Sequence, residues 1–189
     1  MALDDRRERD RVYQAAEDSA LLATAAVAAA EPTDRVLDVG TGSGYVAARV
    51  SETGARVVGT DRNPHACREA RGAGIDTVRA DLTNAFTAKT VDLVTFNPPY
   101  LPTEPGEAVD DWMGMALSGG ETGRAVIEPF LADVGRVLAS EGRVLLLVST
   151  LSGVEAVVDR AVDAGFESET VAAESFPFET LSVLRLSKR

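Results

Sequence analysis

The chain has 189 residues, of which 45% are hydrophobic, and this length and composition are typical of one domain with a sizeable core. No apolar run approaches the ~20 residues that a membrane-spanning helix needs, and the charged start lacks the apolar core of a signal peptide. We therefore expect a cytoplasmic protein. One cysteine and one histidine exclude an internal disulfide and a self-contained Cys/His zinc site, and no metal ligand is predicted.

The charge balance is strongly acidic. Against 30 Asp and Glu residues stand 19 Lys and Arg residues, of which only Lys89 and Lys188 are lysines, and the net charge is −11. This composition indicates adaptation to high salt, with an acidic protein from a GC-rich genome as the alternative. Net negative charge argues against nucleic-acid binding, but the Debye length of only ~3 Å at molar salt weakens that argument.

Apolar segments that predict strands alternate along the chain with segments that predict helices. We expect strands at Arg35–Val39, 56–60, 75–80, Val91–Phe96, 143–149, 167–174 and 180–187, and helices at 15–30, 43–52, 63–72, 122–139 and 153–164. Asn63 is expected to cap its helix, with Pro64 at the first helical position. The alternation predicts an α/β fold, with a mostly parallel sheet, helices on both faces and a C-terminal antiparallel hairpin. The irregular stretch 101–123 is expected to be a loop on the substrate side.

A glycine turn directly follows the first predicted strand, in Asp38-Val39-Gly40-Thr41-Gly42-Ser43-Gly44. Glycine lets the backbone approach a ligand closely, so Gly40 and Gly42 are candidate ligand contacts. The same glycines fit the dinucleotide-binding pattern GxGxxA, which leaves a Rossmann oxidoreductase open at this point. Asp38 argues against that alternative, because a carboxylate just before the glycines suits a cationic ligand better than a pyrophosphate.

Polar side chains stand at the ends of four consecutive predicted strands: Asp38, Asp61, Asp81 and Asn97. Because ligands bind at the carboxyl ends of such strands, we expect these side chains to form one site. Asp61 has the position of a carboxylate that takes both ribose hydroxyls, and Asp81 could accept from an adenine amino group. With the cationic preference of Asp38, this favours S-adenosylmethionine, which carries an ammonium and a sulfonium.

The run Asn97-Pro98-Pro99-Tyr100 is the most informative in the chain. Two prolines after a strand stop regular structure and form a stiff turn. The turn presents the Asn97 amide, the Pro98 carbonyl and the Tyr100 ring, which can accept two hydrogen bonds from a planar NH2 group and pack against its plane. The run resembles the signature of methyltransferases that act on amide or exocyclic amino nitrogens, and this resemblance makes the three residues the catalytic candidates.

Nearly the whole chain resembles the HemK-type class I methyltransferases, most closely their small archaeal and eukaryotic branch. The run 12–19 matches the family's N-terminal segment, with Ala15 where the family usually has Pro. Further matches to the family's motifs are the glycine turn, Asp61-Arg62-Asn63-Pro64, Asp81-Leu82, the Asn-Pro-Pro-Tyr run, and blocks at 119–124 and 179–184. The resemblance implies a Rossmann-like class I methyltransferase fold with seven strands over residues 1–189, residues 1–32 forming a helical segment over the cofactor. Carried over by motif, the cofactor-binding residues are Tyr13, Ser19, Asp38, Gly40, Gly42, Asp61, Arg62, Asp81, Leu82 and Asn97.

The resemblance also implies a substrate and a partner. The small branch N5-methylates the glutamine of the Gly-Gly-Gln motif in class I translation termination factors. Its members form a heterodimer with a small zinc-binding activator protein, which adds a strand to the edge of the sheet, here at 75–80. Methylation of adenine N6 or guanine N2 in nucleic acid, or of another protein side chain such as lysine, remains the alternative, although a basic stripe is absent from the sequence.

Overall fold

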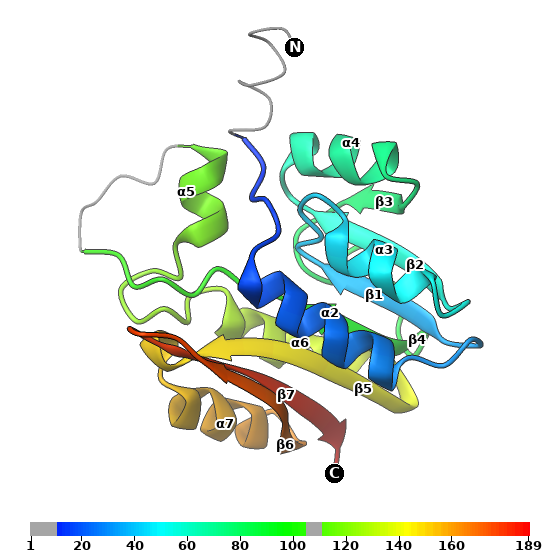
Figure 1. Ribbon diagram of the computed structural model, residues 1–189. Coiled ribbons are helices and arrows are strands. Elements are labelled where there is room, and N and C mark those ends of the chain that lie inside the picture. The colour runs from blue at the N-terminus through cyan, green and yellow to red at the C-terminus, as the bar shows by residue number, and fades with distance from the viewer. Residues whose placement is uncertain (1–10, 105–110) are drawn as a thin grey trace, which may run out of the picture.

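The computed structural model describes residues 11–104 and 111–189, which fold around one seven-stranded sheet (Figure 1). The strands are β1 Arg35–Val39, β2 Arg56–Asp61, β3 Asp76–Arg79, β4 Val91–Phe96, β5 Leu138–Ser149, β6 Phe166–Ser175 and β7 Thr180–Lys188. The helices are α2 Glu17–Ala29, α3 Tyr45–Ser51, α4 Pro64–Gly72, α5 Trp112–Leu117, α6 Ile127–Val137 and α7 Val154–Asp163, with a 3-10 turn at Thr150–Ser152. Among the described residues, no helix is long and apolar enough to cross a membrane.

The strand order is β3-β2-β1-β4-β5-β7-β6. The first five strands pair in parallel, and β7 pairs antiparallel with both of its neighbours. The predicted α/β class, mostly parallel sheet and C-terminal hairpin are therefore confirmed. Because the first five strands run the same way, their carboxyl ends meet at one edge, on the left of Figure 1.

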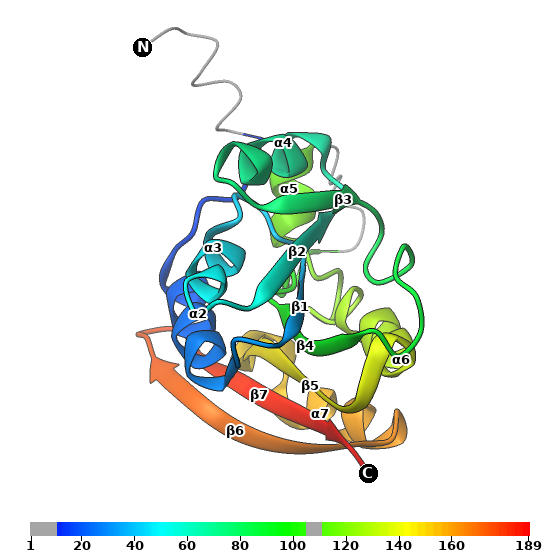
Figure 2. The same ribbon diagram turned by 90° about the vertical axis from the view of Figure 1, so that its right-hand side faces the viewer.

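Both faces of the sheet are covered, as the edge-on arrangement in Figure 2 shows. On one face α2 and α3 pack side chains such as Leu22 and Val50 against Leu93 and Leu145. On the other face α6 and α7 pack against the opposite sides of the same strands. The apolar run 144–148 is fully buried in the middle of this sandwich, as its unbroken hydrophobicity predicts. This packing holds the carboxyl ends of β1, β2 and β4 in fixed register.

Three predicted segments need correction. The helix expected at 122–139 begins only at Ile127, because Gly120 and Gly123 adopt positive φ values of 70° and 71° that form a turn, and it ends at Val137. The next residue, Leu138, already pairs with Val91, so β5 starts five residues earlier than 143. The stretch 101–123 is also not irregular throughout, since it contains α5; residues 105–110 of that stretch lie outside the described residues.

Candidate functional site

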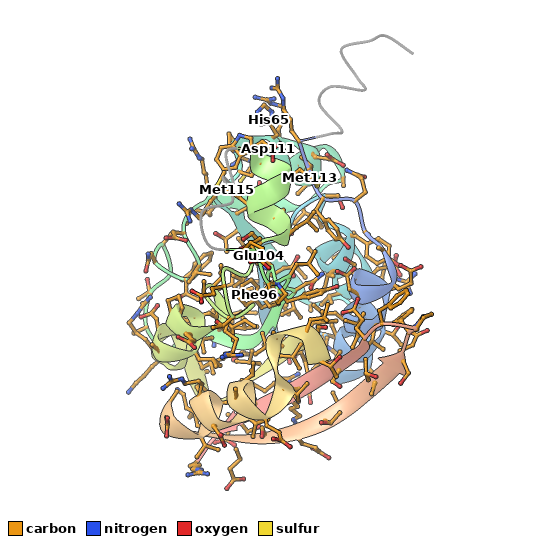
Figure 3. The ribbon with its side chains drawn as sticks, turned by 90° about the vertical axis from the view of Figure 1, so that its left-hand side faces the viewer. His65, Phe96, Glu104, Asp111, Met113 and Met115 are labelled. Carbon is orange, nitrogen blue, oxygen red and sulfur yellow. The ribbon has the colours of Figure 1, made fainter. Side chains whose placement is uncertain are left out.

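A cavity of about 210 Å³ opens at the carboxyl edge of the sheet. Figure 3 looks onto this edge, with Phe96 near the centre and α5, which carries Met113 and Met115, above it. All twelve residues that the sequence assigned to the site line the cavity: Tyr13, Ser19, Asp38, Gly40, Gly42, Asp61, Arg62, Asp81, Leu82, Asn97, Pro98 and Tyr100. The chain thus brings together residues from positions 13 to 100, because they lie at or just after the carboxyl ends of strands, or at or just before the start of α2, which reaches the same edge.

The glycine turn lies at the floor of the cavity. Gly42 has a φ of 55°, and a Cβ built on it would lie 3.6 Å from the Tyr13 carbonyl oxygen, so a side chain there would be strained and would occupy ligand space. Gly44, with φ 85°, lets the turn approach α4 so closely that an added Cβ would lie 3.0 Å from that of Ala70. The glycines therefore serve both the packing of the turn and access to the cavity.

Asp38 is buried at the end of β1 beneath the turn. Its carboxylate accepts hydrogen bonds from the hydroxyls of Thr41, at 2.7 Å, and Thr95, at 2.6 Å. Burial outweighs these bonds and raises the pKa of Asp38 to about 6. Within the described part of the chain, the donors to this carboxylate are hydroxyls and backbone N–H groups, so its negative charge is buried without a cation beside it. A cation in the cavity would offset the energetic cost of that burial.

Asp61 is held by the backbone at the end of β2. The N–H of Gly42 donates to one of its oxygens at 3.0 Å, and the N–H of Asn63 donates to the other at 2.8 Å. Each carboxylate oxygen keeps a second lone pair for a ligand hydroxyl. Burial raises the pKa of Asp61, with the backbone bonds acting in the opposite direction. Asn63 caps α4 through the N–H of His65 at 2.9 Å, as predicted.

The third predicted acid is less enclosed. The Asp81 side chain is 54% exposed, and its carboxylate lies 3.7 Å from the Arg62 guanidinium, so this ion pair contributes little to stability. Leu82 has a φ of 49°, in the left-handed region that costs a leucine energy. Its side chain packs against the core. Both residues line the cavity.

Asn97 is held by a buried network at the end of β4. Its Nδ2 donates to Asp18 Oδ2 at 3.0 Å and to Ser19 Oγ at 3.4 Å. The Tyr13 hydroxyl donates to the same Asp18 oxygen at 3.0 Å. The other end of the amide, Asn97 Oδ1, is buried without a hydrogen-bond partner. A buried acceptor that lines a cavity and lacks a donor is expected to receive one from a ligand.

The rest of the Asn-Pro-Pro-Tyr turn forms one wall of the cavity. Pro98 is buried, and the half-buried Tyr100 packs against the core cluster that includes Leu93 and Leu145. Burial raises the pKa of Tyr100, and the nearby carboxylates of Asp18 and Glu179 raise it further. Tyr100 therefore stays a neutral phenol at any physiological pH, as a ring that packs against a ligand requires.

The sequence missed two contributors to the site. Asp18 lies within the quoted run 12–19, but an acid in the first turn of a helix usually serves the helix dipole, and nothing nearby in the sequence marks its contact with Asn97. Helix α5 lines the cavity with Trp112 and Met115, and Asp111 caps it through the N–H of Gly114 at 2.6 Å. An Asp before an apolar hexapeptide is the signal that could have found it.

Comparison with known proteins gives the family. A methyltransferase domain model matches residues 36–120. The chain is 34% identical over 180 residues to a putative protein N5-glutamine methyltransferase of Methanocaldococcus jannaschii, across 92% of this chain and 90% of that protein. It is 32% identical over 192 residues to methyltransferase HEMK2 of Homo sapiens, across 94% and 90%.

The chain belongs to the HemK-type methyltransferase family. A solved structure agrees: a chain of the E. cuniculi Mtq2-Trm112 complex, described as responsible for methylation of the eRF1 termination factor, aligns with a TM-score of 0.79 and 29% identity over 95% of this chain and 99% of that one. As a HemK-type enzyme, the chain transfers a methyl group from S-adenosylmethionine, and the resemblance found in the sequence is confirmed.

The cavity fits this cofactor. A buried carboxylate at Asp38 suits the cationic end, the two fixed oxygens of Asp61 suit a pair of hydroxyls, and Gly42 leaves room for a ligand where a side chain would stand. The described residues contain no group of three or more His, Cys, Asp or Glu side chains placed to hold a metal ion.

Proposed function

We propose that this HemK-type enzyme methylates the side-chain nitrogen N5 of the glutamine in the Gly-Gly-Gln motif of a class I translation termination factor. The observation that carries the proposal is the buried, unpartnered Oδ1 of Asn97, which needs an N–H donor from the methyl-accepting substrate. A glutamine amide supplies two such donors. The names of the relatives from Methanocaldococcus jannaschii and of the E. cuniculi complex support the same substrate class.

Two hydrogen-bond acceptors of this chain would hold the amide of the substrate glutamine. Asn97 Oδ1 takes one N–H, the Pro98 carbonyl takes the other, and the Tyr100 ring packs on the amide plane. An amide nitrogen is a poor nucleophile because its lone pair is delocalised. Two fixed acceptors draw that lone pair out of conjugation, aim the nitrogen, and stabilise the positive charge that develops on it. S-adenosylmethionine, when bound, would supply the electrophilic methyl group on its sulfonium and would leave as S-adenosylhomocysteine, and the methylated nitrogen would give up one of its protons to solvent.

The cofactor is assigned to the remaining predicted residues of the cavity. Asp38 faces the cationic methionine end, together with Tyr13, on the segment before α2, and Ser19, near the start of α2. Gly40 and Gly42 leave space for the ligand, and Asp61 takes the ribose hydroxyls. The proposed adenine end consists of Arg62, Asp81 and Leu82, where the half-exposed Asp81 carboxylate accepts from the exocyclic amino group. In this arrangement residues 11–32 lie beside the methionine end, and the stretch from 101 to 123 faces the substrate.

The partner proposal concerns the edge of the sheet. Strand β3 is the outermost strand on its side, and Val78 on it is 39% exposed. An edge strand with an exposed apolar side chain suits a small activator that adds a strand, and we assign that place to a zinc-binding protein of the kind named in the E. cuniculi complex. The pair would act in the cytoplasm of a salt-adapted cell, where termination factors are found.

The test is methyl transfer in vitro. The purified heterodimer and labelled S-adenosylmethionine are incubated with the termination factor, and with a matched factor that carries Ala in place of the motif glutamine. Label in the first factor and none in the second is expected. Equal labelling of both factors, or labelling of RNA or DNA instead, would overturn the proposal. A parallel reaction without the activator tests the partner proposal. If the lone chain is as active as the heterodimer, the partner proposal is overturned.

A further inference from the structure

A hydrogen-bond network around Asp18 joins the start of α2 to the end of β4. Asp18 is only 5% exposed, and both of its oxygens are occupied. Oδ1 accepts from the backbone N–H of Ser19 at 2.6 Å, while Oδ2 accepts from the Tyr13 hydroxyl and from Asn97 Nδ2, each at 3.0 Å. The contact between Asp18 and Asn97 spans 79 residues of sequence. Three donors therefore converge on one buried carboxylate.

This arrangement fixes which end of the Asn97 amide faces the cavity. An ionised carboxylate only accepts hydrogen bonds, so the amide must turn its NH2 group toward Asp18. In the reverse orientation the Asn97 carbonyl oxygen would lie against Asp18 Oδ2, two acceptors would face each other, and the NH2 group would lose its partners. The carbonyl oxygen consequently turns away from Asp18, where it is buried and unpartnered, on a residue that lines the cavity.

We infer that Asp18 is a positioning residue, which holds the Asn97 amide with its oxygen toward the acceptor and so makes the site select groups that donate N–H. Resting on the proposed function, this explains how the enzyme would accept glutamine and reject glutamate. A glutamate carboxylate has no N–H and would bring a third acceptor against Asn97 Oδ1 and the Pro98 carbonyl. Sites that lose such partners discriminate by ~10⁴ or more.

The sharpest variant is Asp18→Asn, which keeps the shape and removes one acceptor. Its single carbonyl oxygen stays with the Ser19 N–H, the shortest bond in the network, and its NH2 group then faces Asn97. The Asn97 amide turns over and presents NH2 to the cavity. Methyl transfer to the glutamine factor should fall ~10²-fold or more. A factor with Glu at the acceptor position should bind the variant more tightly than it binds the wild type.

The matched control is Asp34→Asn. Asp34 is buried to the same degree, 6% exposed, but its partner is Arg143 at 2.6 Å, and neither residue lines the cavity. Assayed well below its unfolding temperature, this variant should keep wild-type methyl transfer and wild-type rejection of the Glu factor. If Asp34→Asn relaxed the rejection as much as Asp18→Asn does, general loosening of the fold would explain the effect and the inference would fall.

Two readouts separate positioning from cofactor binding. In a double-mutant cycle, Asp18→Asn should cost turnover in the wild type and almost nothing in Asn97→Ala, because Asp18 acts through Asn97. Additive losses, with cofactor affinity weakened as much as turnover, would make Asp18 a cofactor contact and overturn the inference. In the cofactor-free protein, the NMR side-chain amide protons of Asn97 should be protected from exchange, and Asp18→Asn should shift them and speed exchange. If Asp18→Asn leaves the chemical shifts and exchange rates of these protons unchanged, the positioning role is refuted, whether or not the termination factor is the substrate.

Discussion

Cofactor binding should weaken as the pH falls through the titration of Asp38. Burial raises the pKa of this carboxyl to about 6 in the cofactor-free protein. A cationic ligand beside it favours the ionised form, so the ligand must bind the fraction of molecules in which Asp38 has lost its proton. At about pH 7.5 nearly all molecules qualify, and at about pH 5 roughly one in ten does. The dissociation constant should therefore rise about tenfold, which is ~1.4 kcal/mol.

Calorimetry can measure both the affinity and the proton. Titration of S-adenosylmethionine in two buffers of different ionisation enthalpy should show release of about half a proton per cofactor bound near pH 6, and almost none near pH 8. Asp38→Asn should bind weakly at every pH and release no proton in this range. Asp61→Asn, which also lies in the cavity, should keep much of the slope of the wild type. If the dissociation constant of the wild type does not change between about pH 7.5 and about pH 5, the reasoning is refuted.

The same pKa has a consequence for stability with the opposite sign. Between pH values of about 4, the pKa of Asp38 in the unfolded chain, and about 6, its pKa in the folded protein, Asp38 holds its proton only when the protein is folded. The free energy of unfolding should thus fall as the pH rises through this window, by up to roughly 3 kcal/mol. Asp38→Asn should remove that fall and stabilise the cofactor-free protein at neutral pH. A variant less stable than the wild type in urea unfolding at pH 7 would contradict this account.

Three further predictions follow from the site and the surface. Asn97→Ala should lower the turnover number ~10²–10³-fold while S-adenosylmethionine still binds, and near-normal turnover would remove Asn97 from the mechanism. Asp61→Ala should weaken cofactor binding by one to two decades in calorimetry, because charge-assisted hydrogen bonds of about 1.5–3 kcal/mol are lost; unchanged affinity would contradict the ribose assignment. Raising KCl from dilute to molar concentration should raise the thermal unfolding midpoint, because salt screens the self-repulsion of a net charge of −11, and a falling midpoint would argue against salt adaptation.

The sequence predicted the positions of the cavity residues after position 35 well, because they lie at or just after the ends of strands that the sheet holds in place. Asp38, Asp61 and Asn97 needed only the expected parallel order to be placed at one edge. The prediction of Asn63 as a cap also holds, since the Asn-Pro pair acts locally. These features depend on short-range chemistry and on one topological rule.

What the sequence could not give depends on contacts distant along the chain. The partner of Asp18 lies 79 residues away, and no local pattern records it. Helix α5 has only six residues, too few to show helical periodicity within a stretch rich in Gly and Pro. The start of α6 was misplaced because a close backbone packing decides it: a Cβ on Gly119 would lie 2.6 Å from Gly123. Such close approaches are visible only in three dimensions.

The most direct test of the central claim is mass spectrometry of the termination factor from cells with and without this gene. The account predicts one added methyl group on the glutamine of the Gly-Gly-Gln peptide in the first sample and none in the second, with the modification restored by the wild-type gene and not by the Asn97→Ala gene. An unmodified glutamine in both samples, or a methylated glutamine that persists when the gene is removed, would contradict it.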